Sequence, residues 1–290
     1  MKICRFDNNR LGLVQGDQVC DVTAALESLP SHRYPLPSTD PLITHLPMVL
    51  EEIRRIAPSA AALPLAGRRL LAPVANPGKV IGAPVNYKKH LDEARAQAEI
   101  HHNNQIAEIQ QIGLFLKANS SVVGASHGVE VQHPERRNDH EAELVLVIGK
   151  AGRNIPRARA FEHIAAYCVG LDMTVRGPQE RSMRKSIDSY TVVGPWMVTA
   201  DELADPQALD FWLTVNGEPR QRANTRDLVL DIPALIETAS SYYSLQPGDL
   251  LFTGTPEGVG PVVDGDVIAV EFEGIGRMNV DVRNARRTYP

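Results

Sequence analysis

Residues 139–149 read Asp-His-Glu-Ala-Glu-Leu-Val-Leu-Val-Ile-Gly. The five consecutive aliphatic residues before the glycine predict a strand that is buried on both faces. Residues i and i+2 of a strand share one face, so Glu141 and Glu143 point the same way with side chains roughly 7 Å apart. Two ionised carboxylates in a dry interior need a positive charge between them, and a bound cation is the simplest candidate.

The same spacing also fits a strand end at the surface, where both glutamates are simply solvated. The unbroken apolar run behind them weighs against that alternative. A third acid weighs against it further, because Asp172 is the only charged residue between Tyr167 and Val175. Lone acids in apolar segments are usually paired or bound to a metal.

Composition narrows the class of protein. The chain has 290 residues, 43% hydrophobic and 22% charged, with a formal net charge of -5. Lysines and arginines are scattered, so neither nucleic acid nor a membrane surface is expected as a partner. No apolar run approaches the roughly 20 residues of a membrane span, and no signal peptide is recognised. Three widely spaced cysteines indicate neither a disulfide framework nor a zinc knuckle, so a cytoplasmic location is expected.

Residues 1–72 are predicted to form a small amino-terminal domain. Short apolar runs on either side of a turn predict a β-hairpin within residues 11–22. One helix is expected over His45–Ile56. The proline-bounded segment Pro73–Pro77 is interpreted as a linker, and residues 73–290 as the second, larger domain.

Few helices are expected in the larger domain. Residues 88–95 favour a helix, Pro156 opens a helical pattern over 155–166, and Asp231 caps a helix over 231–245. The polar stretch 96–111 lacks an apolar stripe and fits either a lid or a plain surface loop. Residues 181–190 are basic and polar, so a solvated loop is the default interpretation.

Strands dominate the carboxyl-terminal two-thirds of the chain, and helices do not alternate with them regularly. This arrangement argues against a Rossmann fold or a TIM barrel. The predicted class is α+β, mainly β.

Two further features suggest chemistry. His90 and Glu93 stand at i and i+3, so they would share one face of the predicted helix, where the carboxylate can hold one ring nitrogen and leave the other as a base. A solvated pair on an exposed helix is the alternative. The glycine-rich loop at residues 252–260 exposes backbone N–H groups and a hydroxyl that could hold a carboxylate. It is not a P-loop, because no Gly-Lys-Ser/Thr follows.

With these residues in view, the chain resembles the fumarylacetoacetate hydrolase family over roughly residues 78–283. Each motif is weak alone, and their number and order make the match specific. The motifs, in chain order, are Asn86-Tyr87-x-x-His90-x-x-Glu93, Phe115-Leu116-Lys117, Asp139-x-Glu141-x-Glu143-Leu144, Asp172 with Arg176 and Gln179, Lys185-Ser186-x-Asp188, Gly194-Pro195-Trp196, Val215-Asn216-Gly217-Glu218, and Thr253-Gly254-Thr255-Pro256-x-Gly258-Val259-Gly260.

The resemblance implies a mixed β-roll of several sheet layers with a small amino-terminal domain, usually as a homodimer. It implies a metal site made of Glu141, Glu143 and Asp172, and an acid–base pair made of His90 and Glu93 on a lid. Lys185 would act as a catalytic residue beside the reacting carbonyl. The substrate-binding residues that it implies are Tyr87, Lys117, Arg176, Gln179, Gly254 and Thr255.

Three carboxylates without a histidine or cysteine ligand suit Mg²⁺ or Mn²⁺ rather than zinc. Together with the resemblance, this gives the first hypothesis, a metal-dependent hydrolase that cleaves a C–C bond in an acylpyruvate-type diketo acid, through an enolate of the 2-oxo acid. The second is an isomerase of hydroxymuconate-type acids, or a decarboxylase of oxaloacetate-like acids, at the same site. A third is a catalytically silent protein that binds a metal or a carboxylate. The lid segment is longer than in many relatives, so the substrate could differ.

Overall fold

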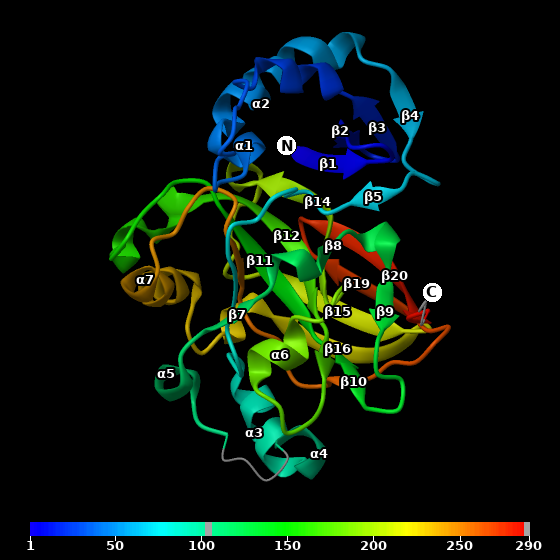
Figure 1. Cartoon of the computed structure of the whole chain (residues 1–290), viewed down its shortest axis with the longest axis vertical. Coiled ribbons are helices and arrows are strands. Elements are labelled where there is room, and N and C mark those ends of the chain that lie inside the picture. The colour runs from blue at the N-terminus through cyan, green and yellow to red at the C-terminus, as the bar shows by residue number, and fades with distance from the viewer. Residues whose placement is uncertain (102–105, 287–290) are drawn as a thin grey trace.

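The computed structural model describes residues 1–101 and 106–286 (Figure 1). Within them the strands form three sheets, of 12, three and five strands, and the helices are short. The predicted class, α+β and mainly β, is confirmed.

The amino-terminal part is an antiparallel ribbon of strands covered by helices. Its elements are β1 (Lys2–Phe6), β2 (Arg10–Gln15), β3 (Gln18–Asp21), a 3₁₀ turn (Thr23–Ser28), α1 (Pro41–Thr44), α2 (Leu46–Ile56), a second 3₁₀ turn (Ala57–Ser59), β4 (Ala62–Pro64) and β5 (Leu70–Leu71). The predicted hairpin is β2–β3, and the helix predicted over His45–Ile56 is α2, so both are confirmed.

The next part of the chain carries the helices that lie at the lower end of the molecule in Figure 1. Its elements are β6 (Val80–Gly82), α3 (Lys88–Ala96), α4 (Ala98–His101), α5 (Ile109–Ile112), β7 (Phe115–Lys117), β8 (Val122–Val123) and β9 (Val129–Val131), with 3₁₀ turns at Asn119–Ser121 and Ala125–His127. The helix predicted over residues 88–95 is confirmed. Residues 102–105 of the predicted lid lie outside the described part of the chain, and the lid itself stays a prediction.

The middle of the chain supplies the strands at the centre of the fold. Its elements are β10 (Asn138–His140), β11 (Ala142–Ile148), a 3₁₀ segment (Arg157–His163), β12 (Ile164–Asp172), β13 (Thr174–Val175), α6 (Arg181–Lys185) and β14 (Thr191–Thr199). The large sheet runs β4-β3-β2-β1-β14-β12-β11-β17-β6-β7, with β5 beside β1 and β8 beside β14. The predicted metal ligands Glu141, Glu143 and Asp172 therefore lie on the neighbouring strands β11 and β12 or at their ends.

The carboxyl-terminal part forms most of the five-stranded sheet, whose order is β16-β15-β19-β20-β9. Its elements are a 3₁₀ turn (Ala200–Glu202), β15 (Asp210–Val215), β16 (Glu218–Asn224), a 3₁₀ turn (Thr225–Asp227), α7 (Ile232–Tyr242), β17 (Leu250–Phe252), β18 (Gly260–Pro261), β19 (Val267–Phe272) and β20 (Gly276–Asn284). The Asp231 side chain accepts a hydrogen bond of 2.9 Å from the amide of Ala234, which confirms the predicted cap of α7. The helix itself ends three residues earlier than expected.

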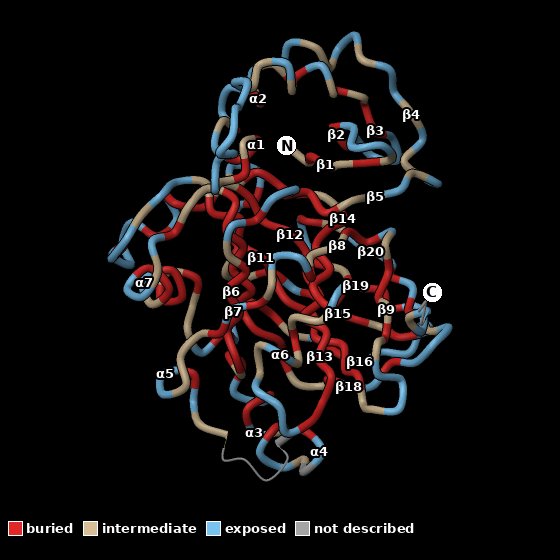
Figure 2. The backbone as a smooth tube through the Cα atoms, viewed as in Figure 1, coloured by how far each residue is buried: buried red, intermediate tan, exposed pale blue. Residues whose placement is uncertain are grey.

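Strand β11 is buried along its whole length, as the aliphatic run predicted (Figure 2). Leu144, Leu146 and Ile148 belong to the larger apolar core, whereas Val145 and Val147 pack in a second core with residues of the amino-terminal part. The large sheet also continues across the expected boundary, because β1 pairs with β14. The division at residue 72 stays a prediction, and the two parts share one sheet and one core.

Two local predictions are wrong. The helical pattern over 155–166 gives only the 3₁₀ segment, after which the chain enters β12. The apolar residues that follow Ile164 pair with both β11 and β14, and those two ladders outweigh a weak helical preference. Residues 181–190 are not a plain solvated loop either. Glu180 accepts a hydrogen bond of 2.6 Å from the amide of Ser182 at the start of α6, which buries Lys185.

No helix in the described part of the chain is long and apolar enough to cross a membrane. Cys4, Cys20 and Cys168 are free and buried.

Candidate active site with a carboxylate metal centre

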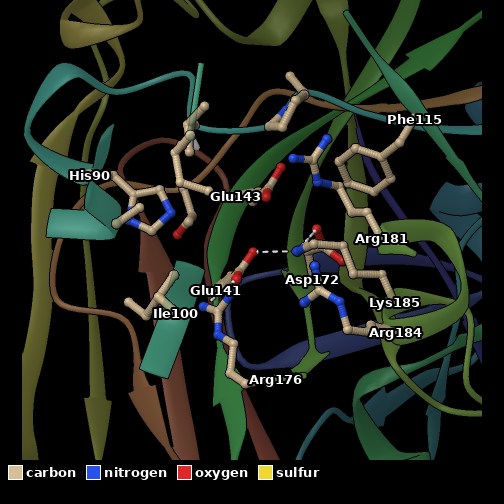
Figure 3. Close-up of a pocket in the computed structure, with 16 residues that line it drawn as sticks. His90, Ile100, Phe115, Glu141, Glu143, Asp172, Arg176, Arg181, Arg184 and Lys185 are labelled. Atoms are coloured by element: carbon tan, nitrogen blue, oxygen red, sulfur yellow. Dashed lines mark hydrogen bonds and ion pairs between the residues drawn. The ribbon is translucent and has the colours of Figure 1, made fainter. Parts of the chain in front are cut away.

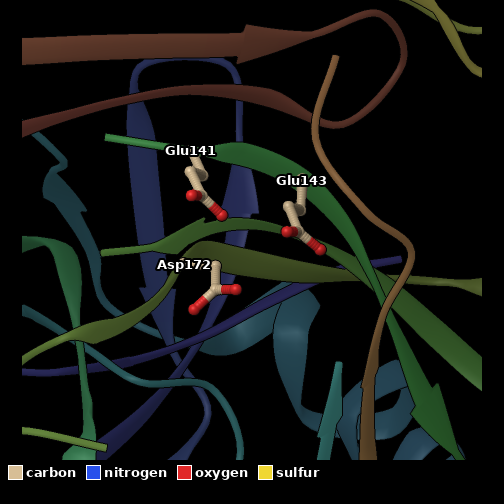
Figure 4. Close-up of side chains that lie close together, drawn as sticks. All are labelled: Glu141, Glu143 and Asp172. Carbon is tan, nitrogen blue, oxygen red and sulfur yellow. The ribbon is translucent and has the colours of Figure 1, made fainter. Parts of the chain in front are cut away.

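Three acidic side chains converge at the end of β11 and β12 (Figure 4). Glu143 pairs with Gly170 across the antiparallel ladder, and the amide of Asp172 donates a hydrogen bond of 2.9 Å to the carbonyl of Glu141. This register brings one oxygen from each of Glu141, Glu143 and Asp172 to within 4.8 Å of one another, and all three side chains are buried. Clustered carboxylate oxygens of this kind are the donors that Mg²⁺ and Mn²⁺ prefer.

Glu141 is held by positive charge on two sides. Its carboxylate accepts hydrogen bonds from Lys185 Nζ at 2.6 Å and from the Arg176 guanidinium at 2.9 Å, and Thr174 Oγ1 donates a third at 3.0 Å. Burial alone would raise the pKa of Glu141, but the charges of Lys185 and Arg176 outweigh that effect and hold the pKa well below its usual range. Glu141 is therefore a fixed anion.

Asp172 is paired in a similar way. Its two oxygens contact Lys117 Nζ and Lys185 Nζ, the second at 2.7 Å. Lys117 also donates to the carbonyl of Tyr190 at 2.9 Å, so two of its three N–H donors are used by Asp172 and the backbone. The assignment of Lys117 to substrate binding stays a prediction, since in this geometry its charge is directed at Asp172.

Glu143 differs from the other two acids. Within the described residues its only hydrogen bond comes from the amide of Gly254, at 2.7 Å, and no cationic side chain pairs with it. Burial raises the pKa of Glu143 well above its usual range, and the negative charge of Asp172 adds to the rise. A buried carboxylate without a cation is costly, so Glu143 supplies the structural evidence that this cluster fits a divalent ion.

The predicted acid–base pair forms on α3. His90 Nδ1 lies 2.9 Å from Glu93 Oε2, and the other oxygen of Glu93 accepts a hydrogen bond of 3.1 Å from the amide of Gly258. His90 is buried, so the alternative of a solvated pair on an exposed helix is wrong. With Nδ1 held by Glu93, the imidazole is oriented and Nε2 remains to exchange a proton.

The acids and His90 line one cavity of about 60 Å³ (Figure 3). A strand wall contributes Glu141, Glu143, Asp172 and Arg176, and a helical wall contributes residues of α3, α4 and α6 together with the segments around them. The complete lining is Ala83, Pro84, Val85, His90, Ala94, Ile100, Ile106, Phe115, Glu141, Glu143, Asp172, Arg176, Arg181, Arg184, Lys185 and Thr255.

The remaining predicted substrate-binding residues divide into two groups. Arg176 and Thr255 line the cavity. The amide of Gly254 donates a hydrogen bond to Glu143, which is part of the lining. Tyr87 instead packs edge-on against Phe211, with ring centroids 6.2 Å apart, and is absent from the cavity lining. Gln179 accepts a hydrogen bond of 2.8 Å from Arg136 outside the cavity. The structure thus brings together most of the predicted site, but not these two side chains.

Three side chains at or next to the site were not predicted from the sequence motifs. Arg181 and Arg184 line the cavity from α6. The side chain of Gln221 is buried behind it, where Oε1 accepts from the amide of Ala142 at 3.0 Å and Nε2 donates to Thr255 Oγ1 at 2.8 Å. The basic composition of residues 181–190 was a signal for the two arginines. The polar sequence of β16 gave none for Gln221.

Comparison with known proteins places these residues in context. The family profile described as Fumarylacetoacetate (FAA) hydrolase C-terminal matches residues 79–283. A maleylpyruvate hydrolase from Aquipseudomonas alcaligenes is 56% identical over 288 residues, which cover 98% of this chain and 100% of that protein.

Solved structures of related enzymes are also similar to this chain. The crystal structure of maleylpyruvate hydrolase from Sphingobium sp. SYK-6 in complex with manganese(II) and pyruvate superposes with a TM-score of 0.82, at 42% identity over 99% of this chain and 100% of that one. A 5-carboxymethyl-2-hydroxymuconate delta-isomerase from Mycobacterium smegmatis has a TM-score of 0.70 at 29% identity, over 98% of this chain and 100% of that one. Hydrolases and isomerases therefore share this arrangement of strands.

Proposed function

The chain belongs to the fumarylacetoacetate hydrolase family, and from that premise we propose that it is a divalent-metal-dependent hydrolase of acylpyruvate-type diketo acids, with maleylpyruvate as its substrate. Membership confirms the resemblance drawn from the motifs and the β-roll fold that it implied. The observation that carries the proposal is the convergence of Glu141, Glu143 and Asp172 on one cavity that also holds the His90–Glu93 pair.

Glu141, Glu143 and Asp172 would hold the metal ion, and the manganese in the relative from Sphingobium supports Mg²⁺ or Mn²⁺. When bound, such an ion acts as a Lewis acid that stabilises negative charge on the keto oxygen of a 2-oxo acid. The donor set is complete within the chain. The uncompensated charge of Glu143 explains why a cation is needed there.

His90 supplies the base. Its Nε2 takes a proton from a water molecule that attacks the distal carbonyl carbon of the diketo acid, and Glu93 stabilises the resulting imidazolium through Nδ1. The bond between that carbonyl carbon and the neighbouring methylene carbon then breaks. The carbonyl side leaves as a carboxylic acid, and the methylene side takes a proton to become pyruvate.

Lys185 stabilises the oxygen of the attacked carbonyl. Its ammonium is buried on the cavity wall and is positioned by Glu141, Asp172 and Thr174, at 2.6, 2.7 and 2.6 Å. These three acceptors use all three N–H donors of the ammonium, so Lys185 must release one of them before it can donate to the developing oxyanion. Thr255 and Arg176 line the same cavity and are assigned to the carboxylate of the pyruvyl end.

The same site could serve an isomerase, as the hydroxymuconate isomerase among the structural neighbours indicates. A substrate panel separates the possibilities. The purified protein with Mg²⁺ or Mn²⁺ is incubated with maleylpyruvate, fumarylpyruvate, acetylpyruvate and oxaloacetate, while diketone absorbance and pyruvate are followed. Loss of absorbance with one pyruvate per molecule of maleylpyruvate supports hydrolysis. Pyruvate from oxaloacetate alone, or conversion of maleylpyruvate without pyruvate, would overturn it.

The proposal includes a homodimer in the cytoplasm, as the family resemblance and the cysteine content suggested. The dimer is tested by light scattering on the full chain, where the mass of a single chain would contradict it. The location is tested by cell fractionation.

A further inference from the structure

Four cationic side chains line the cavity, and two of them are paired with acids. Arg176 contacts Asp139 at 2.7 Å and Glu141 at 2.9 Å, while Lys185 contacts Glu141 and Asp172. Their charges are neutralised by the protein itself. They hold the metal-binding acids in place, and neither carries a charge that lacks a partner in the protein.

The third cation, Arg184, is tied to the backbone. Its Nε donates to the carbonyl of Gln179 at 2.8 Å, and one terminal nitrogen reaches the carbonyl of Val175 at 3.5 Å. These bonds anchor α6 to the end of β13. The guanidinium is therefore used mainly to hold the helix.

The fourth cation, Arg181, has no hydrogen bond or ion pair with any residue that the structure describes. Its guanidinium carbon lies 5.7 Å from the centroid of the buried Phe115 ring, and the Lys185 ammonium lies 5.5 Å from the same centroid. Figure 3 shows the guanidinium beside Phe115, on the opposite side of the cavity from His90. Burial lowers the pKa of Arg181, opposed by the negative charge of Glu141. A half-buried guanidinium that faces a cavity with no acceptor indicates a binding site for an anion.

The proposed substrate offers such an anion. One of its carboxylates adjoins the keto group at the pyruvyl end, and the other lies beyond the carbonyl that water attacks. A metal ion cannot be the partner of Arg181, since the two would repel each other. We propose that Arg181 binds the distal carboxylate of the substrate and makes the enzyme selective for diketo acids that carry two carboxylates. This inference rests on the proposed function.

The planar fork of a guanidinium matches a carboxylate with two parallel hydrogen bonds, which an ammonium does not reproduce. Phe115 fixes the plane of the fork by packing against it. Substitution of Arg181 should therefore affect substrates according to their distal group and leave the chemistry at the pyruvyl end unchanged.

The test compares Arg181→Met and Arg181→Lys with the wild-type enzyme, on maleylpyruvate and on acetylpyruvate, which has a methyl group in place of the distal acid. We expect Arg181→Met to lower kcat/KM for maleylpyruvate by about 10²-fold, as loss of a desolvated charge partner does. Its kcat/KM for acetylpyruvate should stay near the wild-type value, and Arg181→Lys should fall between the two enzymes on maleylpyruvate.

Arg184→Met is the matched control, because it removes a guanidinium from the same helix and the same cavity. Because Arg184 also holds α6, which carries Arg181, its loss for maleylpyruvate should be smaller than that of Arg181→Met. Binding of oxalate in the presence of Mn²⁺, measured by calorimetry, reports on the pyruvyl end without turnover. Its Kd should be the same for Arg181→Met and wild type, which also shows that the variant is folded.

Equal effects of Arg181→Met on both substrates, or no effect on either, would overturn the inference while the wild-type activity upholds the proposed function. A selective loss in Arg184→Met and none in Arg181→Met would also overturn it. A wild-type enzyme that hydrolyses neither diketo acid would overturn the proposed function and the inference together.

Discussion

The two walls of the cavity differ in how completely their polar groups are paired. On the strand wall, Glu141, Asp172 and Arg176 each make at least two hydrogen bonds or ion pairs to other side chains. On the helical wall, His90 contacts Glu93, and among the described residues Arg181 has no hydrogen bond or ion pair and lies against the ring of Phe115. The strand wall is a fixed network. The helical wall is mixed, because Lys185 and Arg184 of α6 are paired within the protein, whereas His90 Nε2 and the Arg181 guanidinium have no hydrogen-bond partner among the described residues.

This difference indicates that the strand wall keeps the metal-binding geometry constant and that the helical wall determines which substrate is accepted. The strand wall is anchored in the paired strands β11 and β12, so its geometry persists whatever the substrate. The helical wall stands on short helices joined by loops, which can vary without disturbing the sheets. Structures described as a hydrolase and as an isomerase superpose on this fold, which fits this division.

Glu143 is the exception on the strand wall, and substituting it gives the largest expected effect. Glu143→Gln should reduce turnover to the level seen without metal, because a ligand is lost. The metal-free variant should be as stable as wild type or more so, since the substitution removes a buried carboxylate with no cationic partner. Calorimetric titration with Mn²⁺ measures the loss of metal binding, and chemical denaturation in the presence of EDTA measures the stability of the metal-free variant.

Glu141→Gln is the comparison for that variant. It also loses turnover, but it leaves Lys185 and Arg176 without their shared partner, and the free energy of unfolding should fall by about 3–5 kcal/mol. If the two variants lose the same stability, the contrast between a paired and an unpaired acid is wrong.

The acid–base pair on the helical wall gives the next effect. His90→Ala and Glu93→Gln should each lower kcat by roughly 10²–10⁴-fold, the usual contribution of a positioned base. Since neither side chain contacts the acids of the strand wall within the described residues, the affinity for Mn²⁺ should stay at the wild-type value. Steady-state kinetics and metal titration measure both quantities, and a parallel loss of metal binding would remove the assigned roles.

A smaller effect is expected from pH, through Glu143. Burial raises the pKa of its carboxyl above the ordinary 4.5, so in the metal-free protein the carboxyl is protonated at pH values where a free glutamate is ionised. Below the raised pKa a metal ion must displace that proton, and the affinity for Mn²⁺ should fall by about tenfold per pH unit.

The direction of the pKa shift of Glu143 also determines how the stability of the metal-free protein changes with pH. A raised pKa in the folded state contributes stability that is present below 4.5 and is lost as pH rises through the folded value. Mn²⁺ titration at several pH values, in buffers of different ionisation enthalpy, reports the affinity and the released proton. An affinity that is independent of pH would contradict the assignment.

The smallest effect concerns Gln221, a positioning residue that joins the two strand segments of the site. Gln221→Leu leaves the amide of Ala142 without an acceptor and Thr255 without a donor, which should cost about 1–3 kcal/mol of stability. We expect about a tenfold loss of kcat/KM, expressed mainly in KM if Thr255 holds the substrate carboxylate. A loss confined to kcat would mean that Gln221 acts through Ala142 and the neighbouring metal ligands rather than through Thr255.

The sequence revealed the strand wall better than the helical wall, for a physical reason. Glu141, Glu143 and the aliphatic run obey the two-residue period of a strand, and Asp172 stands alone in an apolar segment, so local pattern and burial agree. The His90–Glu93 pair obeys the spacing of a helix face. Each of these signals lies within a few residues of chain.

The features that escaped prediction depend on contacts between distant segments. The sequence of residues 155–166 has a helical pattern, but Ile164–Asp172 forms a strand because it pairs with both β11 and β14. Among the described residues Arg176 is paired with acids and Arg181 is not. This difference depends on the positions of Asp139 and Glu141, which the sequence near α6 does not indicate. Gln221 reaches Ala142 across 79 positions of chain.

The pairing of β1 with β14 has a practical consequence for anyone who shortens the protein. A polypeptide begun at the family-matched region would lack β1, so one side of β14 would offer unbonded amides and carbonyls to neighbouring molecules. The apolar face that now covers Val145 and Val147 would be stripped from the back of the catalytic strand as well. Such a fragment is expected to aggregate rather than behave as a minimal enzyme, because the first seventy residues contribute to the core that covers one face of β11.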